Sequence, residues 1–522
     1  MEHPKSTFKI HSCFRDGTLP AWIEVEIHAC FQIPGLQILG LPAPEIREAK
    51  ERILAAFPAS GFEFPRKKVT INLAPSSIPK WGTAHDLPIA LRILSLVEAL
   101  PPGPPVLANG ELGLDGGVRS TGSPALLMEL LLNDPRPDGF RVILAEDDHR
   151  AYLNLIRWRQ QRSLPLPRNT RVFRISHFSQ IRKVLSETDI PVLPAPTADE
   201  RPRERNATTV AHPHLLAPGP RLERILTLAS IGRHHTLLLG PKGIGKSESL
   251  AWFRTLAGEP DPQDSWTRIV HQESRNEAPD PGLPARRVHS QVKPQHLLGS
   301  FGPKGYRAGE LALSHGGFLF ADEFMEWSRD SKESLREPLE ARSFRLTRVQ
   351  GSVEVPCDLQ LVATGNLCPC GGLPVELARL IPGSKGNCRC PPGITRAYLS
   401  RLSGPILDRI DLPVLLRAES GQNTEKNPED RIHEAVNKGR KFALEHFGVL
   451  PSRMSAAGLE ADLSNPGIRS LLDAASPSLR FRHKTLRVAK SIQAHEQSTR
   501  LEAHHVLEAL ALRELDTHLG NG

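Results

Sequence analysis

The sequence predicts a multidomain α/β protein with a nucleotide-binding core and a helical C-terminal part. Strand-like and helix-like runs alternate up to about residue 190. A glycine-rich loop at 240–247 then separates an apolar run from a helical pattern, as in phosphate-binding loops. Beyond about residue 416, the apolar residues recur at helical spacing. These patterns favour three folded parts.

Composition marks the borders between these parts. Residues 192–219 are rich in proline and charge and lack apolar periodicity, so we expect a linker there. We therefore predict an N-terminal α/β domain at 1–191, a nucleotide-binding core at 220–415 and a helical domain at 416–522.

Each part is justified by its own runs of residues. In the first, strand-like and amphipathic runs alternate at 22–31, 36–42, 45–57, 68–75, 86–100 and 141–147. In the core, we expect a helix at 221–232, a strand, loop and helix within 235–253, and further apolar strands at 316–324 and 359–366. In the last part, helical spacing occurs at 429–448, 468–475, 486–496 and 502–515.

Composition limits the class of protein. Of the 522 residues, 39% are hydrophobic and 24% are charged, as in core-forming soluble proteins. No apolar run approaches the roughly 18 residues of a membrane span, and the N-terminus lacks a signal-peptide pattern. We therefore expect a cytoplasmic protein without a membrane partner. The net charge of +8 allows a polyanionic partner but does not require one.

The glycine-rich loop fits the P-loop pattern of glycine, four residues and Gly-Lys-Ser/Thr. Its glycines let backbone N–H groups surround a phosphate, and the next helix directs its positive end at the same anion. Lys246 would reach the β- and γ-phosphates, and Ser247 would ligate Mg²⁺. The predicted ATP site consists of Gly240, Pro241, Lys242, Gly243, Ile244, Gly245, Lys246 and Ser247.

Two later strands end in polar residues suited to ATP hydrolysis. The strand "FLFADE" ends in Asp322, which would hold Mg²⁺, and Glu323, which would orient the attacking water or accept its proton. The strand "LQLVATGN" ends in Asn366, whose amide could position the same water. A turn-forming role is the alternative for Asn366.

Four of the seven cysteines lie in one short window, as two Cys-x-Cys pairs. An odd cysteine count without a secretory signal favours reduced thiols or a metal site over disulfides. Four thiolates suit tetrahedral zinc, although one intervening residue per pair is tighter than the usual two to four. Structural zinc and free thiols both remain open for Cys368, Cys370, Cys388 and Cys390.

The order of these motifs resembles the ComM/YifB family of AAA+ ATPases, relatives of the magnesium-chelatase motor subunit. The resemblance rests on the P-loop followed by "GELALSHGGFLFADE", "LREPLEARSFRLTR", "LQLVATGNLCPCGG" and "RLSGPILDRIDL". It extends to "VEIHACFQIPGLQILGLPAPEIREAKERI" and "GELGLDGGVRS" near the N-terminus. It implies a degenerate Lon-protease-like N-terminal domain, an AAA+ P-loop ATPase core and a C-terminal helical lid.

The resemblance also assigns roles to single residues. Asn366 occupies the sensor-1 position, Arg409 that of the arginine finger, and Arg480 that of the sensor-2 arginine, with Arg487 as a second candidate. A finger acts on a neighbouring subunit's nucleotide, so the resemblance implies a homo-hexamer. The alternative for Arg409 is a surface arginine paired with Asp408 or Asp411. Any metal at the cysteines should then stabilise the subunit interface rather than contact the phosphate.

The first domain lacks the catalytic pair of active Lon-type proteases. Such enzymes use a serine whose proton is taken by a desolvated lysine. Alignment with the family places Ala84 near the serine position and Ala125 near the lysine position. The nearby Ser123 and Thr83 are interpreted as turn residues. We expect a noncatalytic module.

The resemblance implies a DNA helicase that promotes branch migration in homologous recombination during natural transformation, with recombination proteins as possible partners. Two segments, 289–309 and 343–355, could line the channel of a ring. They bring basic residues that could contact phosphates, namely Lys293, Lys304, Arg307, Arg345 and Arg348. The basic run 156–183, with interleaved aromatic residues, could form a DNA patch or an ordinary strand and helix.

Two other functions remain open from the sequence. A chelatase-type motor would drive a metal-inserting partner, but the chain has no Asp-x-Ser-x-Ser metal-binding signature. A protein-remodelling ATPase is not excluded by any motif.

Overall fold

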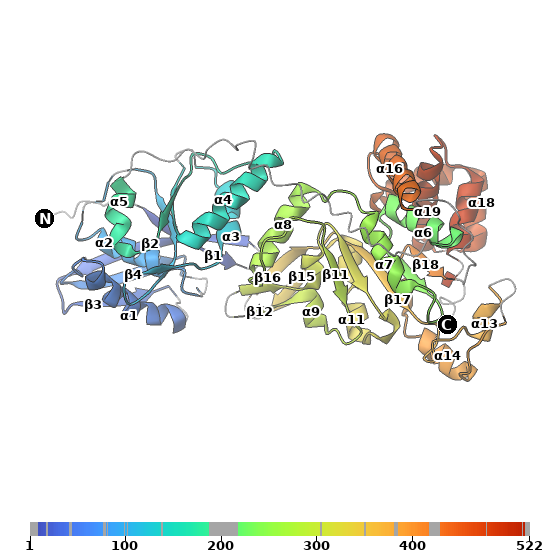
Figure 1. The fold of residues 1–522 in the computed structure, drawn as a ribbon, viewed down its shortest axis with the longest axis horizontal. Coiled ribbons are helices and arrows are strands. Elements are labelled where there is room, and N and C mark those ends of the chain that lie inside the picture. Colours follow the sequence, from blue (N-terminus) through green and yellow to red (C-terminus); the bar gives the residue numbers. More distant parts are fainter. Residues whose placement is uncertain are drawn as a thin grey trace.

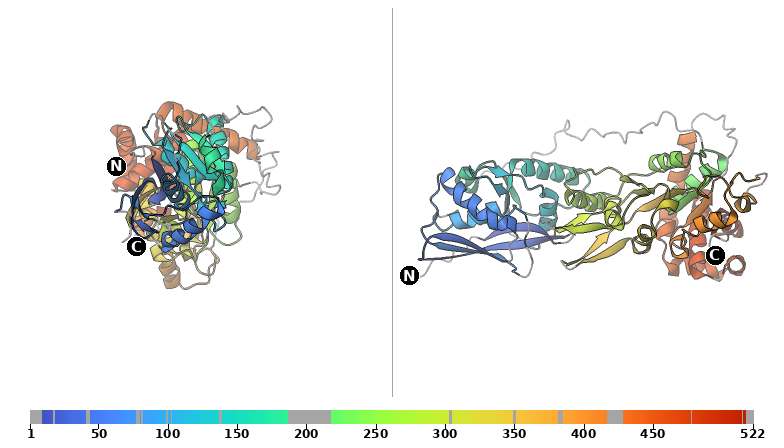
Figure 2. Two further views of the ribbon diagram at one scale, coloured as in Figure 1. Left: turned by 90° about the vertical axis from the view of Figure 1, so that its left-hand side faces the viewer. Right: turned by 90° about the horizontal axis from the view of Figure 1, so that it is seen from below.

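The computed structural model describes residues 9–516 except for short gaps and one long one. The undescribed positions within that range are 17–18, 41–43, 77–79, 81, 99, 102, 137–138, 187–217, 303–304, 349–350, 381–384, 417–427, 477 and 514. Almost all of the predicted linker at 192–219 therefore lies outside the described residues. The rest forms three units in a row along the long axis of the molecule (Figure 1; Figure 2, right).

The first unit is built on a mixed seven-stranded sheet. Its order is β3-β4-β2-β1-β5-β8-β9, with β2 antiparallel to β1 and β4 and the other pairs parallel. Val69, Ile71 and Leu73 of β4 are buried in alternation with less buried neighbours, as expected for a strand with one face on a core. The strands are β1 (Ile10–Asp16), β2 (Leu19–Cys30), β3 (Gly35–Leu39), β4 (Lys68–Ala74), β5 (Val106–Asn109), β8 (Arg141–Ala145) and β9 (Arg171–Ile175), with a separate pair β6 (Glu111–Leu112) and β7 (Val118–Arg119).

Helices cover this sheet and complete the first unit. They are α1 (Pro44–Ala59), α2 (Asp86–Leu94), α3 (Pro124–Leu132), α4 (Glu146–Gln161) and α5 (Ile181–Ser186). Helix α2 is buried along almost its whole length, because it packs between the sheet and α1.

The second unit contains a five-stranded parallel sheet with the order β11-β14-β17-β10-β18. All six residues of β17 are buried, which is typical of a strand covered on both faces. The strands are β10 (Thr236–Leu239), β11 (Ala285–Val288), β14 (Phe318–Ala321), β17 (Gln360–Gly365) and β18 (Leu412–Leu415). The strands predicted at 235–253, 316–324 and 359–366 are confirmed as β10, β14 and β17. Parallel strands with helical crossovers match the fold class of an AAA+ core.

The connections of this sheet carry helices and two hairpins. The hairpins are β12 (Gly299–Gly302) with β13 (Gly305–Ala308), and β15 (Ser343–Arg348) with β16 (Gly351–Pro356). The helices are α6 (Pro220–Gly232), α7 (Lys246–Thr255), α8 (Pro262–Glu273), α9 (Pro294–Leu298), α10 (Glu310–Leu313), α11 (Arg329–Glu333), α12 (Arg336–Ala341), α13 (Val375–Ala378), α14 (Pro392–Leu399) and α15 (Gly404–Leu407).

The third unit is helical, as the periodicity predicts, and it is packed onto the second. Its helices are α16 (Pro428–Phe447), α17 (Ala456–Glu460), α18 (Pro466–Ala475), α19 (Leu479–Glu496) and α20 (Ala503–Leu512). Val436 of α16 and Leu486 of α19 share one apolar cluster with Leu238 of β10 and Val362 of β17. The helices thus complete the core that covers one face of the parallel sheet. In the described residues, no helix is both long and apolar enough to cross a membrane.

Helix α8 joins the first two units. Trp266 and Ile269 of α8 belong to the same apolar cluster as α3 and α4 of the first unit. Arg159 of α4 lies 4.4 Å from the Trp266 ring centroid, and the rings of Trp158 and Trp266 stack. The first unit is therefore packed against the second through α8.

A buried carboxylate completes this joint. Glu273, at the C-terminal end of α8, accepts the backbone N–H groups of Ala125 and Leu126 at 2.7 and 2.9 Å. These groups lie in the first turn of α3, where intrahelical acceptors are missing. Arg15 of β1 approaches the same carboxylate to 3.5 Å, and both side chains are less than one-tenth exposed. The second unit thus caps a helix of the first.

We expect Glu273→Ala to weaken this joint. The change leaves Arg15 buried without its carboxylate and two α3 amides without acceptors, which should cost about 3 kcal/mol. The expected result is a lower midpoint of thermal unfolding and faster proteolytic separation of the first unit. Glu259→Ala, at an exposed glutamate shortly before α8, is the control and should behave as wild type. Unchanged melting and proteolysis in Glu273→Ala would contradict the capping role.

Candidate functional site

The glycine-rich loop leaves the carboxyl end of β10 and enters α7 at Lys246. Gly243 and Gly245 have φ angles of +80° and +82°, a left-handed conformation that glycine adopts without strain. Gly240 donates its N–H to the carbonyl of Gly365 on β17 at 3.2 Å, which fixes the start of the loop against the neighbouring strand. The local geometry agrees with the P-loop pattern predicted for Gly240 to Ser247.

Lys246 points back into the loop and onto the next strand. Its Nζ donates to the carbonyls of Gly240 and Pro241 at 2.8 and 2.7 Å and to Oδ1 of Asn366 at 3.1 Å. Burial lowers the pKa of Lys246 to about 8, although Asp322 opposes this effect. Two predicted site residues far apart in the sequence are therefore in direct contact.

Asp322 lies at the carboxyl end of β14, beside the same loop. Its Oδ1 accepts the hydroxyl of Thr364 at 2.6 Å, and its Oδ2 is paired with Arg287. Burial opposes ionisation, but the hydrogen bonds from Thr364 and Arg287 hold the pKa of Asp322 below its ordinary value. Asp322 lies near enough to Lys246 to raise the pKa of the lysine, and Ser247 is the next residue of the loop. A charged carboxylate and a hydroxyl are a donor set that suits Mg²⁺.

Glu323 is exposed and adopts φ +49°, in the left-handed region that side chains other than glycine rarely occupy. Its backbone N–H donates to Oδ1 of Asp322 at 3.1 Å, and its carbonyl accepts from Glu326 at 2.8 Å. The turn leaves the Glu323 side chain exposed at the end of the strand. This position suits a group that orients a water molecule.

Sequence reasoning missed Thr364 and Arg287. Thr364 lies on β17, two residues before Asn366, which follows the strand, so alternation along β17 could have placed its hydroxyl beside Asp322. Arg287 lies on β11, which pairs with β14 in parallel with Arg287 opposite Phe320. No local pattern singles out Arg287 from the other arginines of "PARRVH", because its partner is set by the strand order.

Arg409 follows α15 and precedes β18, and its guanidinium is fully engaged. Its Nε donates to the carbonyl of Arg336 at 2.9 Å, its Nη1 to the carbonyl of Pro405 at 2.6 Å, and its Nη2 pairs with Glu340. The side chain is only 11% exposed. The alternative of an exposed arginine paired with Asp408 or Asp411 does not describe these contacts.

Arg480, in the first turn of α19, approaches the same carboxylate. Its Nη2 lies 3.5 Å from Oε1 of Glu340, and its side chain is 58% exposed. Arg409, Arg480 and Arg487 line one cavity of about 210 Å³ between the second and third units. The three arginines singled out from the sequence therefore gather in one place.

This arginine cluster lies at the opposite edge of the sheet from the P-loop. Asp411 and Leu412 donate their N–H groups to the carbonyl of His235, immediately before β10 begins, whereas the P-loop follows the last residue of β10. A strand of four residues is about 13 Å long. The structure thus separates the arginines from the Lys246 site of their own chain.

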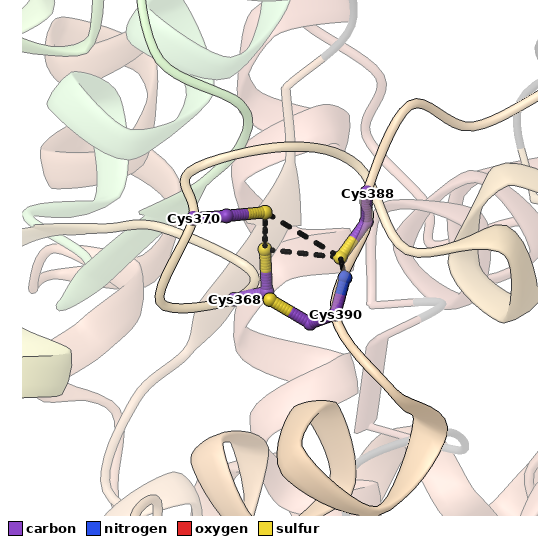
Figure 3. A group of neighbouring side chains, drawn as sticks. All are labelled: Cys368, Cys370, Cys388 and Cys390. Carbon is purple, nitrogen blue, oxygen red and sulfur yellow. Dashed lines mark hydrogen bonds between the residues drawn. The ribbon is translucent and has the colours of Figure 1, made fainter.

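The four cysteines converge from two arms of a loop (Figure 3). The sulfur of Cys368 lies 2.9 Å from that of Cys370 and 3.3 Å from that of Cys388, and the sulfurs of Cys370 and Cys388 are 3.6 Å apart. All four sulfurs, including that of Cys390, lie within 4.8 Å of one another. Hydrogen bonds from Cys368 and from the backbone N–H groups of Gly372 and Arg389 lower the pKa of the Cys370 thiol to about 6. Thiolate character at neutral pH suits metal binding.

The cysteine loop contacts the P-loop of its own chain. The carbonyl of Gly371 accepts the N–H of Lys242 at 2.9 Å. The contact places the cysteine loop beside the P-loop, because the end of β17 lies beside the end of β10. That a metal here would stabilise the subunit interface and not contact the phosphate stays a prediction.

The four residues considered for a Lon-type catalytic pair lie in turns and in the first turn of α3, and the noncatalytic character of the first unit stays a prediction. Ala125 is buried, with its N–H bonded to Glu273, and the Ser123 hydroxyl is directed to the carbonyl of Thr121 at 3.5 Å. The carbonyl of Thr83 accepts the N–H of Asp86 at 3.2 Å, and that of Ala84 accepts the N–H of Gly110 at 3.0 Å. Both positions belong to the turn before α2.

Sequence reasoning missed a hydroxyl and an imidazole in hydrogen-bond contact. Ser12 Oγ lies 2.8 Å from Nδ1 of His85 and donates to Asn109 at 3.0 Å. All three side chains are buried, and burial lowers the pKa of His85 to about 4. The group joins β1 to β5 and has no exposed face for a substrate.

The basic run 156–183 forms the end of α4, β9 and α5. Phe173 and Phe178 are buried in the core of the first unit, and Arg159 stacks on Trp266. The rings of Phe173 and Phe178 are therefore not available for stacking on bases, whereas Trp158 is half-buried. The run forms the end of a helix, a strand and a short helix, and DNA contact by its exposed basic residues stays a prediction.

The predicted channel segments form the two hairpins of the second unit. Arg307 and Arg345 are exposed, and Lys293 precedes α9. Lys304 and the side chain of Arg348 lie outside the described residues.

Comparisons with known proteins identify the family. A model described as magnesium chelatase, subunit ChlI, matches residues 219–424, and one described as subunit ChlI of Mg-chelatase matches residues 23–134. The protein YifB of Escherichia coli K12, itself uncharacterized, is 29% identical, with 95% of this chain and 94% of YifB covered. The competence protein ComM of Haemophilus influenzae is 28% identical, with 96% of each chain covered. The chain belongs to the ComM/YifB family.

Membership of the ComM/YifB family implies an AAA+ ATPase with ATP and Mg²⁺ as cofactors. The residues of the P-loop site fit ATP and Mg²⁺. Lys246 already has its ammonium group at the loop carbonyls, and Asp322 is held ionised beside it. The four cysteines are a donor set for zinc as well, but the family match itself does not establish that metal.

We expect nucleotide affinity to fall as the pH rises above about 8. The Lys246 ammonium loses its proton there, since its pKa is lowered to about 8, and a neutral amine does not attract phosphate. A bound triphosphate raises this pKa again, so binding above that pH should take up a proton. Titration with a fluorescent ATP analogue between about pH 7 and pH 9, with calorimetry in two buffers, measures both effects. Lys246→Arg keeps its charge and should remove the pH dependence. A constant affinity in the wild type would contradict this assignment.

Proposed function

We propose that the chain is an ATP-driven AAA+ motor that assembles as a homo-hexamer and acts on DNA. Within this proposal, it is a helicase that promotes branch migration during homologous recombination in natural transformation. The observation that supports an assembly is the separation of the P-loop from Arg409 and Arg480 by the length of β10. A chain whose arginines lie at the edge opposite its own phosphate site needs a neighbouring copy to complete that site.

In the proposed site, one copy supplies the residues that bind the nucleotide. Lys246 and the amides of the loop hold the phosphates, and Ser247 and Asp322 hold Mg²⁺, which neutralises charge on the phosphate oxygens. Glu323 and Asn366 orient the attacking water. Glu323 is suited to accept a proton because its carboxylate lies on the exposed side of the turn.

The neighbouring copy supplies the arginine pair. Arg409 and Arg480 share Glu340, so the carboxylate keeps two cations at one edge of the sheet. Opposite a neighbour's γ-phosphate, their charge stabilises the transition state. Arg487, in the same cavity, supports this surface. Because Lys484 of α19 donates to the carbonyls of Leu407 and Ile410, movement of the proposed lid is coupled to the segment on both sides of Arg409.

The proposal that the motor moves along DNA is supported by the family rather than by any single residue. A 28% identical relative is named competence protein ComM. Two hairpins of the ATPase core expose Arg307 and Arg345, which suit the phosphate backbone. We propose that the first unit is a noncatalytic Lon-like module, held to the ATPase core through α8, and that the units correspond to domains at 1–191, 220–415 and 416–522.

We expect Arg409→Ala to bind nucleotide normally and to lose ATP turnover by about 10³-fold. The reason is that Arg409 acts on a neighbour's nucleotide and not on its own. Lys246→Ala should lose binding itself. Mixing the two inactive variants should restore part of the ATPase activity, because some interfaces then pair an intact P-loop with an intact arginine.

The matched control is a mixture of Lys246→Ala with Glu323→Gln. Both changes lie on the P-loop side, so no interface is repaired and activity should stay absent. Arg409→Lys, which keeps a cation, and thermal melts separate the chemical effect from loss of folding. Near-normal turnover in Arg409→Ala, or no recovery in the first mixture, would argue against the shared site.

We expect single-stranded or branched DNA to stimulate the ATPase, with an effect that weakens as salt rises, because counterion release drives contacts to phosphates. The chain should also unwind a three-way or four-way junction in the presence of ATP. Arg345→Ala should reduce stimulation, whereas Arg150→Ala, at an exposed arginine of the first unit, should not. Absence of stimulation by every DNA at low salt would favour a protein-remodelling or chelatase-type motor.

A further inference from the structure

The cysteine loop begins where the nucleotide site ends. Oδ1 of Asn366 accepts a hydrogen bond from the ammonium group of Lys246, and Asn366 lies two residues before Cys368. Gly371, between the first cysteine pair and the second arm, accepts the N–H of Lys242. The P-loop is therefore held by this segment at two points, one through a side chain and one through the backbone.

The backbone contact is closely fitted. Gly371 has φ +77°, and a Cβ built on it would lie 2.6 Å from both Cγ and Cδ of Lys242. No side chain can be placed there without moving the lysine stem. The Gly371 carbonyl thus belongs to a loop that packs directly against the P-loop.

Few hydrogen bonds hold the loop in this position. On the first arm, Gly371 donates its N–H to the carbonyl of Cys368 at 3.0 Å. Across the arms, Asn387 and Cys388 both donate to the carbonyl of Leu373 at 3.0 Å, and Asn387 Oδ1 accepts the N–H of Leu373 at 2.6 Å. In the described residues, the other link between the arms is the group of four sulfurs.

Four sulfurs converge at the spacing of a zinc site. Zinc–sulfur bonds of about 2.3 Å place tetrahedral sulfurs about 3.8 Å apart. Three of the separations are 2.9, 3.3 and 3.6 Å, and all lie within 4.8 Å, so a small outward shift of the thiolates admits the ion. Cys368 is buried, whereas Cys370 is exposed, so the site lies at the surface with one ligand anchored in the core. An ion there would tie both arms to the end of β17.

We propose that Zn²⁺ bound by Cys368, Cys370, Cys388 and Cys390 braces the P-loop through the Gly371 carbonyl, so that metal occupancy sets the nucleotide affinity. This inference rests on the proposed nucleotide site. Loss of the ion releases the two arms and with them the acceptor for Lys242. The loop then has to be ordered when nucleotide binds, which lowers affinity.

The test compares metal-loaded and stripped full-length protein. Zinc content is measured by mass spectrometry, and affinity is measured with a fluorescent ATP analogue in the presence of Mg²⁺. We expect close to one zinc per chain in protein purified without chelator. Removal of the zinc should weaken nucleotide binding by about tenfold, the scale of one backbone hydrogen bond, and added Zn²⁺ should restore it.

A variant distinguishes the effect of the Gly371 contact on nucleotide affinity from the effect of zinc on the stability of the cysteine loop. Gly371→Ala keeps all four cysteines but disturbs the contact with Lys242, so it should retain zinc and bind nucleotide weakly. Gly393→Ala is the matched control, because a Cβ at Gly393 meets nothing within 4 Å. It should match wild type in both measurements. Should Gly371→Ala fail to fold, the comparison of stripped and reloaded wild type still decides.

The outcomes are distinct. Less than about half an equivalent of zinc, with all thiols titratable, overturns the metal site while leaving nucleotide binding intact. If the chain binds zinc but removal of the zinc leaves the nucleotide affinity unchanged, the proposed bracing of the P-loop is wrong. No nucleotide binding by fully loaded wild type, under any condition, overturns the proposed function and this inference together.

Discussion

The parallel pairing of β10 with β17 and β18 is the constraint on which the rest of the structure depends. The carboxyl ends of β10, β14 and β17 meet at one edge. This arrangement brings Lys246 into contact with Asn366, more than a hundred residues away in the sequence, and places Asp322 near Lys246. The amino end of β18 places Arg409 at the other edge. One sheet therefore presents a phosphate-binding edge and a cationic edge, and neither can be moved without disrupting the core.

The packing of the C-terminal helices holds the edge of the sheet at which Arg409 lies. His234, just before β10, contacts Oδ2 of Asp411 at 3.2 Å and Ser491 of α19 at 2.7 Å, and all three groups are buried. Lys484 of α19 supplies donors to the turn that leads to Arg409. The third unit is thus connected to the arginine segment by polar bonds as well as by a shared apolar core. A shift of these helices on the sheet would change the orientation of the arginines.

The joint at α8 attaches the first unit to the ATPase core. The backbone N–H of Ala125 donates to the Glu273 carboxylate of the core at 2.7 Å. This face of α3 therefore serves for attachment between the two units. Glu273 and Trp266 lie on one helix of the core, so both the polar and the apolar contacts of the joint come from α8.

The sequence by itself determined the three-part organisation, the P-loop, the strand ends at Asp322 and Asn366 and the family, because these depend on local periodicity and on ordered motifs. Only the tertiary structure decided that Thr364 and Arg287 hold Asp322, that Glu340 joins Arg409 to Arg480, and that Gly371 contacts Lys242. Phe173 and Phe178 of the run 156–183 likewise became core residues once β9 was paired. The physical reason is common to all of these cases. Strand order and packing bring distant residues together, and one-dimensional spacing contains no record of which strand lies beside which.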